Sequence, residues 1–373
     1  MRGSGKRVVA VAYGRDCELV TAFGEGARRI APYSIVRRKG IGSERSRHAC
    51  PHFVSRRYTP VMRAASLIFT CLLCLNAAAC SHGSDNASGV VRVIGAAGTL
   101  PGSFATPRGV SVANNRLWVV DRSGRIQAFS LDGKNEINAA VIDGSHGYPI
   151  GIMALEDGGC WVCDTHNNVM RHFDATAQEL LHFGGVGQEH GKFTWPEHVA
   201  RDADGLLYVT EYGEGAANRV QVFTPEGKFA RAFGEYGTGP GQFSRVIGIV
   251  VVNKEAFICD VSDRIIVYST EGKYLREFGR NGGGVGEFRY PYGICLYDGL
   301  LYIAEYGNHR IQRFTLTGES RGCFGKPGTH AGEFNGPWDI CAGADGFLYV
   351  ADTGNHRVVV LDPKKVSWKE SQE

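Results

Sequence analysis

The chain has 373 residues, of which 51 are glycine, and a formal net charge of +3. Residues 1–61 hold 13 Lys/Arg against 4 Asp/Glu, so residues 62–373 carry a net charge of −6. Because binding to phosphate backbones requires a basic surface, this acidic part argues against nucleic-acid binding. The abundant glycine predicts many tight turns between short strands.

The N-terminal part predicts a signal peptide that begins at Met62 rather than at the first residue. Residues 1–61 are rich in Arg and show no helical or strand period, whereas Met62 and Arg63 precede a 12-residue apolar run, Ala64–Leu75. This run is shorter than the about 20 apolar residues that span a bilayer, and it fits a signal-peptide core over 62–79. We therefore expect residues 1–61 to be a start-site artefact, the alternative being a disordered extension.

Cys80 is the predicted lipidation site. Ala77-Ala-Ala-Cys80 resembles the lipobox of bacterial lipoproteins, although the usual Leu is replaced by Ala77, and ordinary cleavage after Ala79 stays open. Lipidation of Cys80 would anchor the chain to a membrane, with residues 80–88 as a polar tether. The expected location is the bacterial cell envelope, periplasmic or at the outer membrane, or otherwise outside the cell.

A repeat occupies the chain from residue 89 onward. Six short apolar segments each end on an acidic residue, at spacings of 43, 47, 49, 45 and 47: Asp121, Asp164, Glu211, Asp260, Glu305 and Asp352. Each repeat contains a first strand that usually opens at Pro, two further strands separated by polar turns, and a fourth that often ends in Phe-Gly. Periods of this length with four strands each predict an all-β propeller of four-stranded antiparallel blades.

The two ends of the repeat region predict how the ring closes. The sixth repeat stops after its third strand at Leu361, whereas residues 90–95 look like a fourth strand without a blade of its own. Pairing these residues beside 356–361 would close the ring and remove the exposed edges. We therefore predict one domain over 89–363, a monomeric propeller, followed by a polar tail over 364–373.

The repeat residues resemble the NHL family. The resemblance is carried by Tyr349-Val-Ala-Asp352 with Asn355-His-Arg357, by the similar copy around Glu305 and Arg310, and by looser copies in the other repeats. It covers about 89–362 and implies a six-bladed β-propeller, which agrees with the six acidic residues.

Several repeated residues are interpreted as structural. In five repeats an Arg opens the third strand and should pair with the acid that precedes it, whereas Val169 stands there in the second, which leaves Asp164 the least obviously paired. His309 and His356 belong to the turn of the repeat. The cysteines of the repeat region occupy positions that are small and buried in sister repeats, so they are expected in the core.

The repeat is broken at two positions that should face each other across the axis. His198 and Asp339 replace the Gly found in the first strand of the other four repeats. They are predicted either to hold a water, a metal or a polar ligand in the axial channel or to fill space between blades.

Further candidate ligand-binding residues lie beside these two, at the start of the first strands and in the outer loops of the same face. They are Arg108, Glu197, Tyr212, Tyr292, Tyr306 and Trp338. Together they predict a mixed aromatic and charged recognition surface.

The sequence favours a non-enzymatic scaffold that binds a protein, peptide or glycan through this face. No catalytic residue is assigned and no cofactor is required. The alternative is a lyase or hydrolase with an axial Zn or Ca, similar to the amidating-lyase or lactonase propellers, although most of their metal ligands have no counterpart here. A regulatory NHL module fused to a ligase or kinase lacks its RING or kinase motif in this sequence.

Overall fold

The computed structural model describes residues 89–140, 142–144, 146–213 and 215–370. The start-site, signal-peptide and Cys80 predictions fall outside these residues. The described part contains β-strands and three short 3₁₀ turns, and within it no helix is long and apolar enough to cross a membrane.

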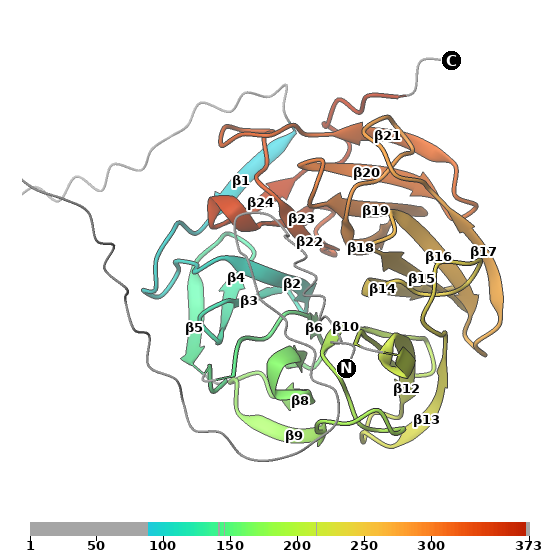
Figure 1. Cartoon of the computed structure of the whole chain (residues 1–373). Helices are drawn as coiled ribbons and strands as arrows, with labels where there is room; N and C mark the ends of the chain where they lie inside the picture. Colours follow the sequence, from blue (N-terminus) through green and yellow to red (C-terminus); the bar gives the residue numbers. More distant parts are fainter. Residues whose placement is uncertain (1–88, 141, 145, 214, 371–373) are drawn as a thin grey trace, which may run out of the picture. The chain divides into compact units, whose positions relative to one another are not determined.

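The strands form six four-stranded antiparallel sheets arranged around one axis (Figure 1). Blade 1 holds β2 (Pro107–Ala113), β3 (Arg116–Asp121), β4 (Arg125–Ser130) and β5 (Asn135–Ala140); blade 2 holds β6 (Ile152–Ala154), β7 (Cys160–Asp164), β8 (Val169–Phe173) and β9 (Glu179–Gly184); blade 3 holds β10 (Pro196–Arg201), β11 (Leu207–Glu211), β12 (Arg219–Phe223) and β13 (Phe229–Phe233). Blade 4 holds β14 (Val246–Val252), β15 (Glu255–Asp260), β16 (Arg264–Ser269) and β17 (Tyr274–Phe278); blade 5 holds β18 (Pro291–Tyr297), β19 (Leu300–Glu305), β20 (Arg310–Thr315) and β21 (Ser320–Phe324). Blade 6 holds β22 (Pro337–Ala342), β23 (Leu348–Asp352), β24 (Arg357–Leu361) and the N-terminal β1 (Val90–Ile94), and the 3₁₀ turns are η1 (Thr165–Asn167), η2 (Gly215–Ala217) and η3 (Thr353–Asn355).

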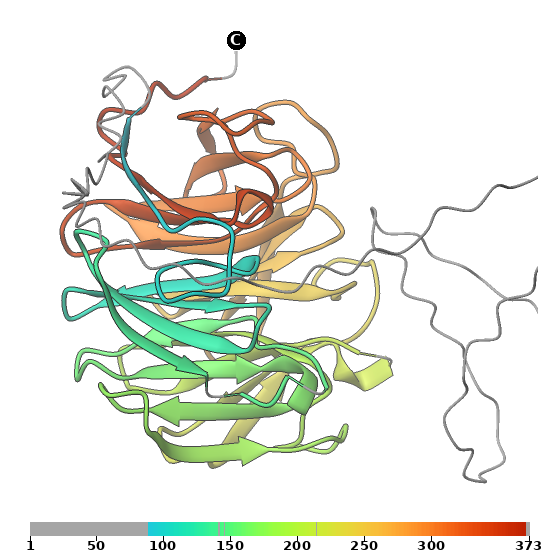
Figure 2. The same ribbon diagram turned by 90° about the vertical axis from the view of Figure 1, so that its left-hand side faces the viewer.

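The predicted closure of the ring is confirmed. β1 pairs antiparallel with β24, with Val90 opposite Leu361 and Ile94 opposite Val358. Ile94 is buried with the valines of β24, and β1 lies beside the last strand in both views (Figures 1 and 2). The first and last strands of the domain therefore share one blade.

The core lies between the blades. The second and third strands are buried on both faces, as in β11 and β12, because each blade is covered by both of its neighbours. The Phe of the Gly-x-Phe signature is fully buried in five repeats and forms a single parallel bridge with the Gly-rich loop before it: Phe104, Phe193, Phe243, Phe288 and Phe334. The signature therefore anchors the return loop in the interblade core.

The repeated Gly of the first strand allows neighbouring blades to approach closely near the axis. A Cβ on Gly151 would lie 2.3 Å from the carbonyl oxygen of Glu197, and one on Gly248 would lie 2.2 Å from that of Tyr292. Gly109 and Gly293 have equally close backbone neighbours. Four of the six blade junctions are therefore packed backbone to backbone.

Gly248→Ala is expected to destabilise the protein by about 1–3 kcal/mol, because the added methyl group overpacks a contact made by backbone atoms. Urea unfolding followed by circular dichroism measures the loss. Gly283→Ala is the matched control, since no atom lies within 4 Å of its added Cβ and the residue is exposed; its change should stay within about 0.5 kcal/mol. Equal stabilities of the two variants would contradict the close-approach argument.

The C-terminal residues through 370 pack against the outside of blade 5, where the sequence had predicted only a polar tail. Lys369 forms a two-bond antiparallel bridge with Cys323 on β21, with both N···O distances at 2.8 Å. Val366 is buried, and the Trp368 ring lies 5.6 Å from Tyr302. We call residues 363–370 the C-terminal strap.

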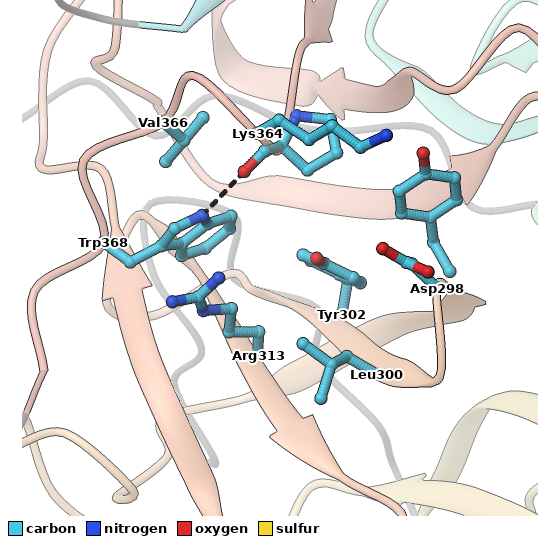
Figure 3. A pocket seen from close by; sticks show the side chains of 9 residues that line it. Asp298, Leu300, Tyr302, Arg313, Lys364, Val366 and Trp368 are labelled. Carbon is cyan, nitrogen blue, oxygen red and sulfur yellow. Dashed lines mark hydrogen bonds between the residues drawn. The ribbon is translucent and has the colours of Figure 1, made fainter.

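A pocket of about 380 Å³ lies between the C-terminal strap and blade 5 (Figure 3). Arg313 lies under the Trp368 ring at 4.8 Å, and the indole N–H of Trp368 donates to the carbonyl oxygen of Pro363 at 3.0 Å. Lys364 of the strap and Asp298 of blade 5 also line the pocket. The Arg313–Trp368 contact helps to hold the strap on the blade, whereas the Trp368–Pro363 bond fixes the fold of the strap itself.

Candidate functional site: the axial mouth

The two positions that break the Gly rule meet across the axis. His198 Nε2 lies 3.5 Å from Asp339 Oδ1, a contact longer than a typical hydrogen bond. Asp339 is itself held by backbone, because its Oδ2 accepts the N–H of Val110 at 3.0 Å and its Oδ1 that of Ile340 at 2.8 Å. Asp339 thus ties blade 6 to blade 1, where a Gly would have left Val110 without this acceptor.

His198 and Asp339 do not by themselves make a metal centre. Among the described residues, no group of three or more His, Cys, Asp or Glu side chains is close enough to hold an ion. Zinc and calcium sites in proteins use three or more protein ligands, and both oxygens of Asp339 already accept backbone N–H groups. The residues described therefore do not fit the predicted Zn or Ca.

An aromatic and cationic cluster covers the same end of the axis. The Arg108 guanidinium lies 3.6 Å from the centre of the Trp338 ring. Trp338 is 4.3 Å from Tyr292, and Tyr292 is 5.3 Å from Tyr306, measured between ring centres. Burial lowers the pKa of Arg108 and raises the pKa of Tyr292 to about 12. Tyr306 is 38% exposed and gives the cluster an accessible face.

A buried carboxylate completes this face on the side of blades 3 and 4. Glu197 is fully buried, and its Oε1 accepts from Arg245 at 3.1 Å. Arg245 also lies 3.9 Å from the Tyr212 ring. Burial raises the pKa of Glu197, although Arg245 and, at longer range, Arg108 oppose the shift.

Sequence reasoning missed Arg245. It immediately precedes Val246. At the position of Val246 each of the other five repeats has a Pro: Pro107, Pro149, Pro196, Pro291 and Pro337. The missing Pro was a usable signal, because a departure from the repeat at the axial end marks a position with its own role. We call Arg108, Glu197, His198, Arg245, Tyr292, Tyr306 and Trp338, with Tyr212 and Asp339 at its sides, the axial mouth.

The axial mouth collects most of the buried polar atoms that have no partner. Nine such side-chain atoms occur among the described residues, and six of them lie in the mouth: Arg108 Nε, Glu197 Oε2, His198 Nδ1 and Nε2, Arg245 Nε and Trp338 Nε1. Buried polar groups are nearly always hydrogen-bonded, since leaving one unpaired costs about 1–3 kcal/mol. These atoms are available to hydrogen-bond ordered water or a polar ligand.

The acidic residues of the repeat are structural, as predicted. Carboxylate–Arg pairs link Asp121 to Arg125, Glu211 to Arg219, Glu305 to Arg310 and Asp352 to Arg357 at 2.5–2.7 Å. In blade 4 the link runs through Ser262, which bonds both Asp260 and Arg264.

Asp164, for which the sequence offered no obvious Arg partner, is also paired. Arg171, two residues beyond Val169 and on the same side of β8, reaches back to Asp164 Oδ2 at 2.8 Å. Side chains two apart on a strand share a face, which is why the displaced Arg can serve the same carboxylate.

The cysteines of the propeller are core residues. Cys160, Cys163, Cys259, Cys295 and Cys323 are buried free thiols, and Cys341 is partly buried. Burial raises the pKa of each of these thiols. Their place in the core agrees with the prediction from the repeat positions, and buried thiols of this kind are poor nucleophiles.

The turn before the third strand carries a contact that joins successive blades, which we call the blade latch. The residue just before the third strand has a left-handed backbone, and its side chain accepts the N–H of the residue that precedes the next first strand. His309 Nδ1 accepts from Gly336 at 2.8 Å and His356 Nδ1 from Thr106 at 3.1 Å. Asn168 and Asp263 accept in the same way from Trp195 at 2.9 Å and Tyr290 at 2.6 Å. The structural interpretation of His309 and His356 is confirmed.

His309→Asn should preserve stability at pH 7 and remove part of the acid sensitivity, because Asn168 performs the same latch without a titrating ring. Burial lowers the pKa of His309, with Asp352 opposing the shift. Its contribution is therefore complete above the unfolded pKa of about 6.5 and is lost as the pH falls through the folded value. His309→Ala should cost about 1 kcal/mol at pH 7. Urea midpoints between pH 5 and 8 measure both effects, and an Asn variant as acid-sensitive as the wild type would refute the latch.

These features define a six-bladed β-propeller. A family model described as a 6-bladed beta-propeller matches residues 198–278, and the NHL repeat model matches residues 288–314 and 334–361. The chain thus contains NHL repeats and a six-bladed propeller domain, as the sequence motifs predicted.

Comparison with known proteins identifies one sequence relative and several structures of similar fold. The chain is 33% identical over 78 residues to RING finger protein nhl-1 of Caenorhabditis elegans, a match that covers 21% of this chain and 8% of that protein. A streptogramin B lyase structure is similar with a TM-score of 0.52 at 16% identity, covering 72% of this chain and 96% of the lyase. A gluconolactonase from Xanthomonas campestris is similar with a TM-score of 0.53 at 14% identity, covering 69% and 86%. At these identities the structural likeness shows the fold alone.

Proposed function

We propose that the protein is a non-enzymatic binding scaffold whose axial mouth receives a protein, peptide or glycan partner. The observation that supports this most strongly is the set of six unpartnered buried polar atoms in one aromatic-lined mouth. Trp, Tyr and Arg are also the residue types that dominate binding energy at recognition surfaces. Enclosed donors beside rigid aromatic rings provide both orientation and contact area for a ligand.

The test is saturable binding without turnover. Panels of peptides and oligosaccharides are titrated against the purified protein, and the ligands are recovered for mass analysis. Trp338→Ala and Tyr306→Ala should weaken any genuine binding at least tenfold, whereas Tyr236→Ala, an exposed aromatic outside the mouth, should leave it unchanged. A ligand recovered with altered mass, or binding insensitive to both mouth variants, would contradict the scaffold.

A second candidate is a lyase or hydrolase with His198 as a base. The observation that favours it is the His198–Asp339 contact, since a carboxylate that orients an imidazole is typical of general bases. Stoichiometric zinc or calcium in the purified protein, lost in His198→Ala, would establish the metal-dependent form of this alternative. A metal-free protein that alters no compound it binds, and whose ligand binding is unchanged by His198→Ala, would remove it.

We also propose that the mature chain is anchored to the bacterial envelope through lipid on Cys80. The support is the apolar run and the Ala-Ala-Ala-Cys sequence that precede the propeller. Labelled palmitate should be incorporated by the wild type and absent from Cys80→Ser. Labelling that survives this substitution would rule out the anchor.

A further inference from the structure

Arg108 is a buried cation without a carboxylate partner among the described residues. Its side chain is only 9% exposed, its Nε has no hydrogen-bond partner, and its close charge-stabilising contact is the Trp338 ring at 3.6 Å. Burying an unpaired charge is costly even when an aromatic ring offsets part of the loss. An arrangement of this kind is stable when an anionic group completes it.

The pairing of charges in the mouth points in the same direction. Arg108 and Arg245 contribute two positive charges, and Glu197 contributes one negative charge already shared with Arg245. Asp339 contributes a second negative charge, but it lies beside His198 and accepts the backbone N–H groups of Val110 and Ile340. The four charges therefore balance, yet among the described residues no carboxylate forms an ion pair with Arg108, so a ligand carboxylate could contact it directly.

The unpartnered atoms specify a ligand rich in acceptors. Three of them are N–H donors with no other role, on Arg108, Arg245 and Trp338, whereas Glu197 Oε2 is the one unpartnered carboxylate oxygen. A planar carboxylate offers two acceptor oxygens and matches a guanidinium fork. A phosphate dianion would bring two negative charges into the same buried space, where Glu197 and Asp339 already carry one each.

We propose that the axial mouth recognises a carboxylate group of its ligand through Arg108, with the aromatic rings of Trp338, Tyr292 and Tyr306 packing on the atoms that carry it. This inference rests on the proposed binding function and deepens it. The carboxylate could belong to a peptide C-terminus or to a uronic acid, which share this chemistry. Arg108 would be the specificity-determining residue, since it lies in the mouth, its Nε has no hydrogen-bond partner, and no carboxylate among the described residues forms an ion pair with it.

The test compares acids with neutral analogues of the same shape on the wild-type protein. N-acetylphenylalanine and its amide represent the peptide source, glucuronate and glucose represent the sugar source, and inorganic phosphate is the third arm. Calorimetric titration at pH 7 should show one of the two acids binding at least tenfold more tightly than its neutral analogue, as expected for about 1.5–3 kcal/mol from a charged hydrogen bond. The acid that binds identifies the source.

Variants then assign the preference to Arg108. Arg108→Gln should reduce the acid-to-neutral ratio to within twofold, and Arg108→Lys should retain part of it because the charge remains. Arg321→Gln, an exposed Arg on blade 5, is the control and should leave the ratio unchanged. Melting curves show whether each variant is folded. The acid-to-neutral binding ratio of the wild-type protein tests the proposal even if a variant fails to fold.

Three results would overturn the inference: neither acid binds, an acid and its neutral analogue bind equally, or phosphate binds as tightly as the better acid. Equal binding of acid and neutral analogue that is still weakened by Trp338→Ala would preserve the binding function and remove only the carboxylate. Binding by none of the panels in the earlier test would remove the function as well, so the two failures are distinguishable.

Discussion

A chain that lacks residues 89–94 is expected to lose more than about 4 kcal/mol of stability and to associate through the uncovered strand. The deletion removes the five residues of β1 and leaves β24 as an open edge. It also exposes Val358 and Val360, which are fully buried in the closed ring. Unpaired edges of this kind recruit strands from other molecules. Thermal unfolding followed by calorimetry, together with light scattering, measures both consequences.

Val93→Thr is the matched control for this deletion. The side chain of Val93 is 47% exposed on β1, so its replacement leaves the backbone ladder with Val359 in place. Its melting temperature should stay close to that of the wild type. A deletion variant that also melted as a monomer at the wild-type temperature would show that the closing strand is dispensable.

Arg310→Met is expected to cost about 3–5 kcal/mol, the penalty for leaving a buried charge without its partner. Arg310 pairs with Glu305 at 2.5 Å and donates to the carbonyl oxygens of Gly283, Gly284 and Glu287 at 2.7–2.8 Å. Glu305 is fully buried, so its carboxylate would lose its counterion without gaining water. Chemical unfolding at pH 7 measures the loss.

The pH dependence of this variant provides a second readout. Burial already raises the pKa of Glu305, with Arg310 opposing the shift, so removing Arg310 raises it further. A raised carboxyl pKa means that stability is complete below the unfolded value of about 4.3 and is lost as the pH rises through the folded value. The deficit of Arg310→Met should therefore be larger at pH 7 than at pH 5. Arg321→Met, in an exposed pair with Glu319, should cost at most about 1 kcal/mol at either pH.

The fold was largely predictable because the same local sequence features recur from repeat to repeat. In most repeats a Pro marks the start of the first strand, the Phe of Gly-x-Phe marks the return loop, and an acid marks the turn before the third strand. Six such repeats in register predict a closed ring. The incomplete sixth repeat even predicted the pairing of β1 with β24. Repetition compensates for the weak signal of any single short strand.

The axial mouth was predictable only where it interrupts the repeat. His198 and Asp339 were identifiable because they replace Gly, and the structure brings them to 3.5 Å. Arg245 was missed because its partner Glu197 is 48 positions away and belongs to the preceding blade. The Arg171–Asp164 pair was missed because an equivalent side chain reached the carboxylate from a shifted position.

The blade latch shows a different limit of prediction from sequence. His356, Asn168 and Asp263 have unlike side chains, yet each presents an acceptor from a left-handed residue to the next blade. Sequence comparison registers residue identity, whereas the contact requires only an acceptor and a backbone conformation. The shared function of these positions therefore becomes visible only in the structure.

The closing strand also determines how the molecule responds to mechanical load. Val90 lies opposite Leu361, so β1 begins at the point where β24 ends and the chain passes into the C-terminal strap. Pulling the chain before Val90 away from the propeller would first break the bond between Asp362 N–H and Gly89 oxygen, at 2.8 Å, and then peel β1 from β24 one pair at a time. Tension applied through the N-terminal segment would thus unzip blade 6 before it strains the other five.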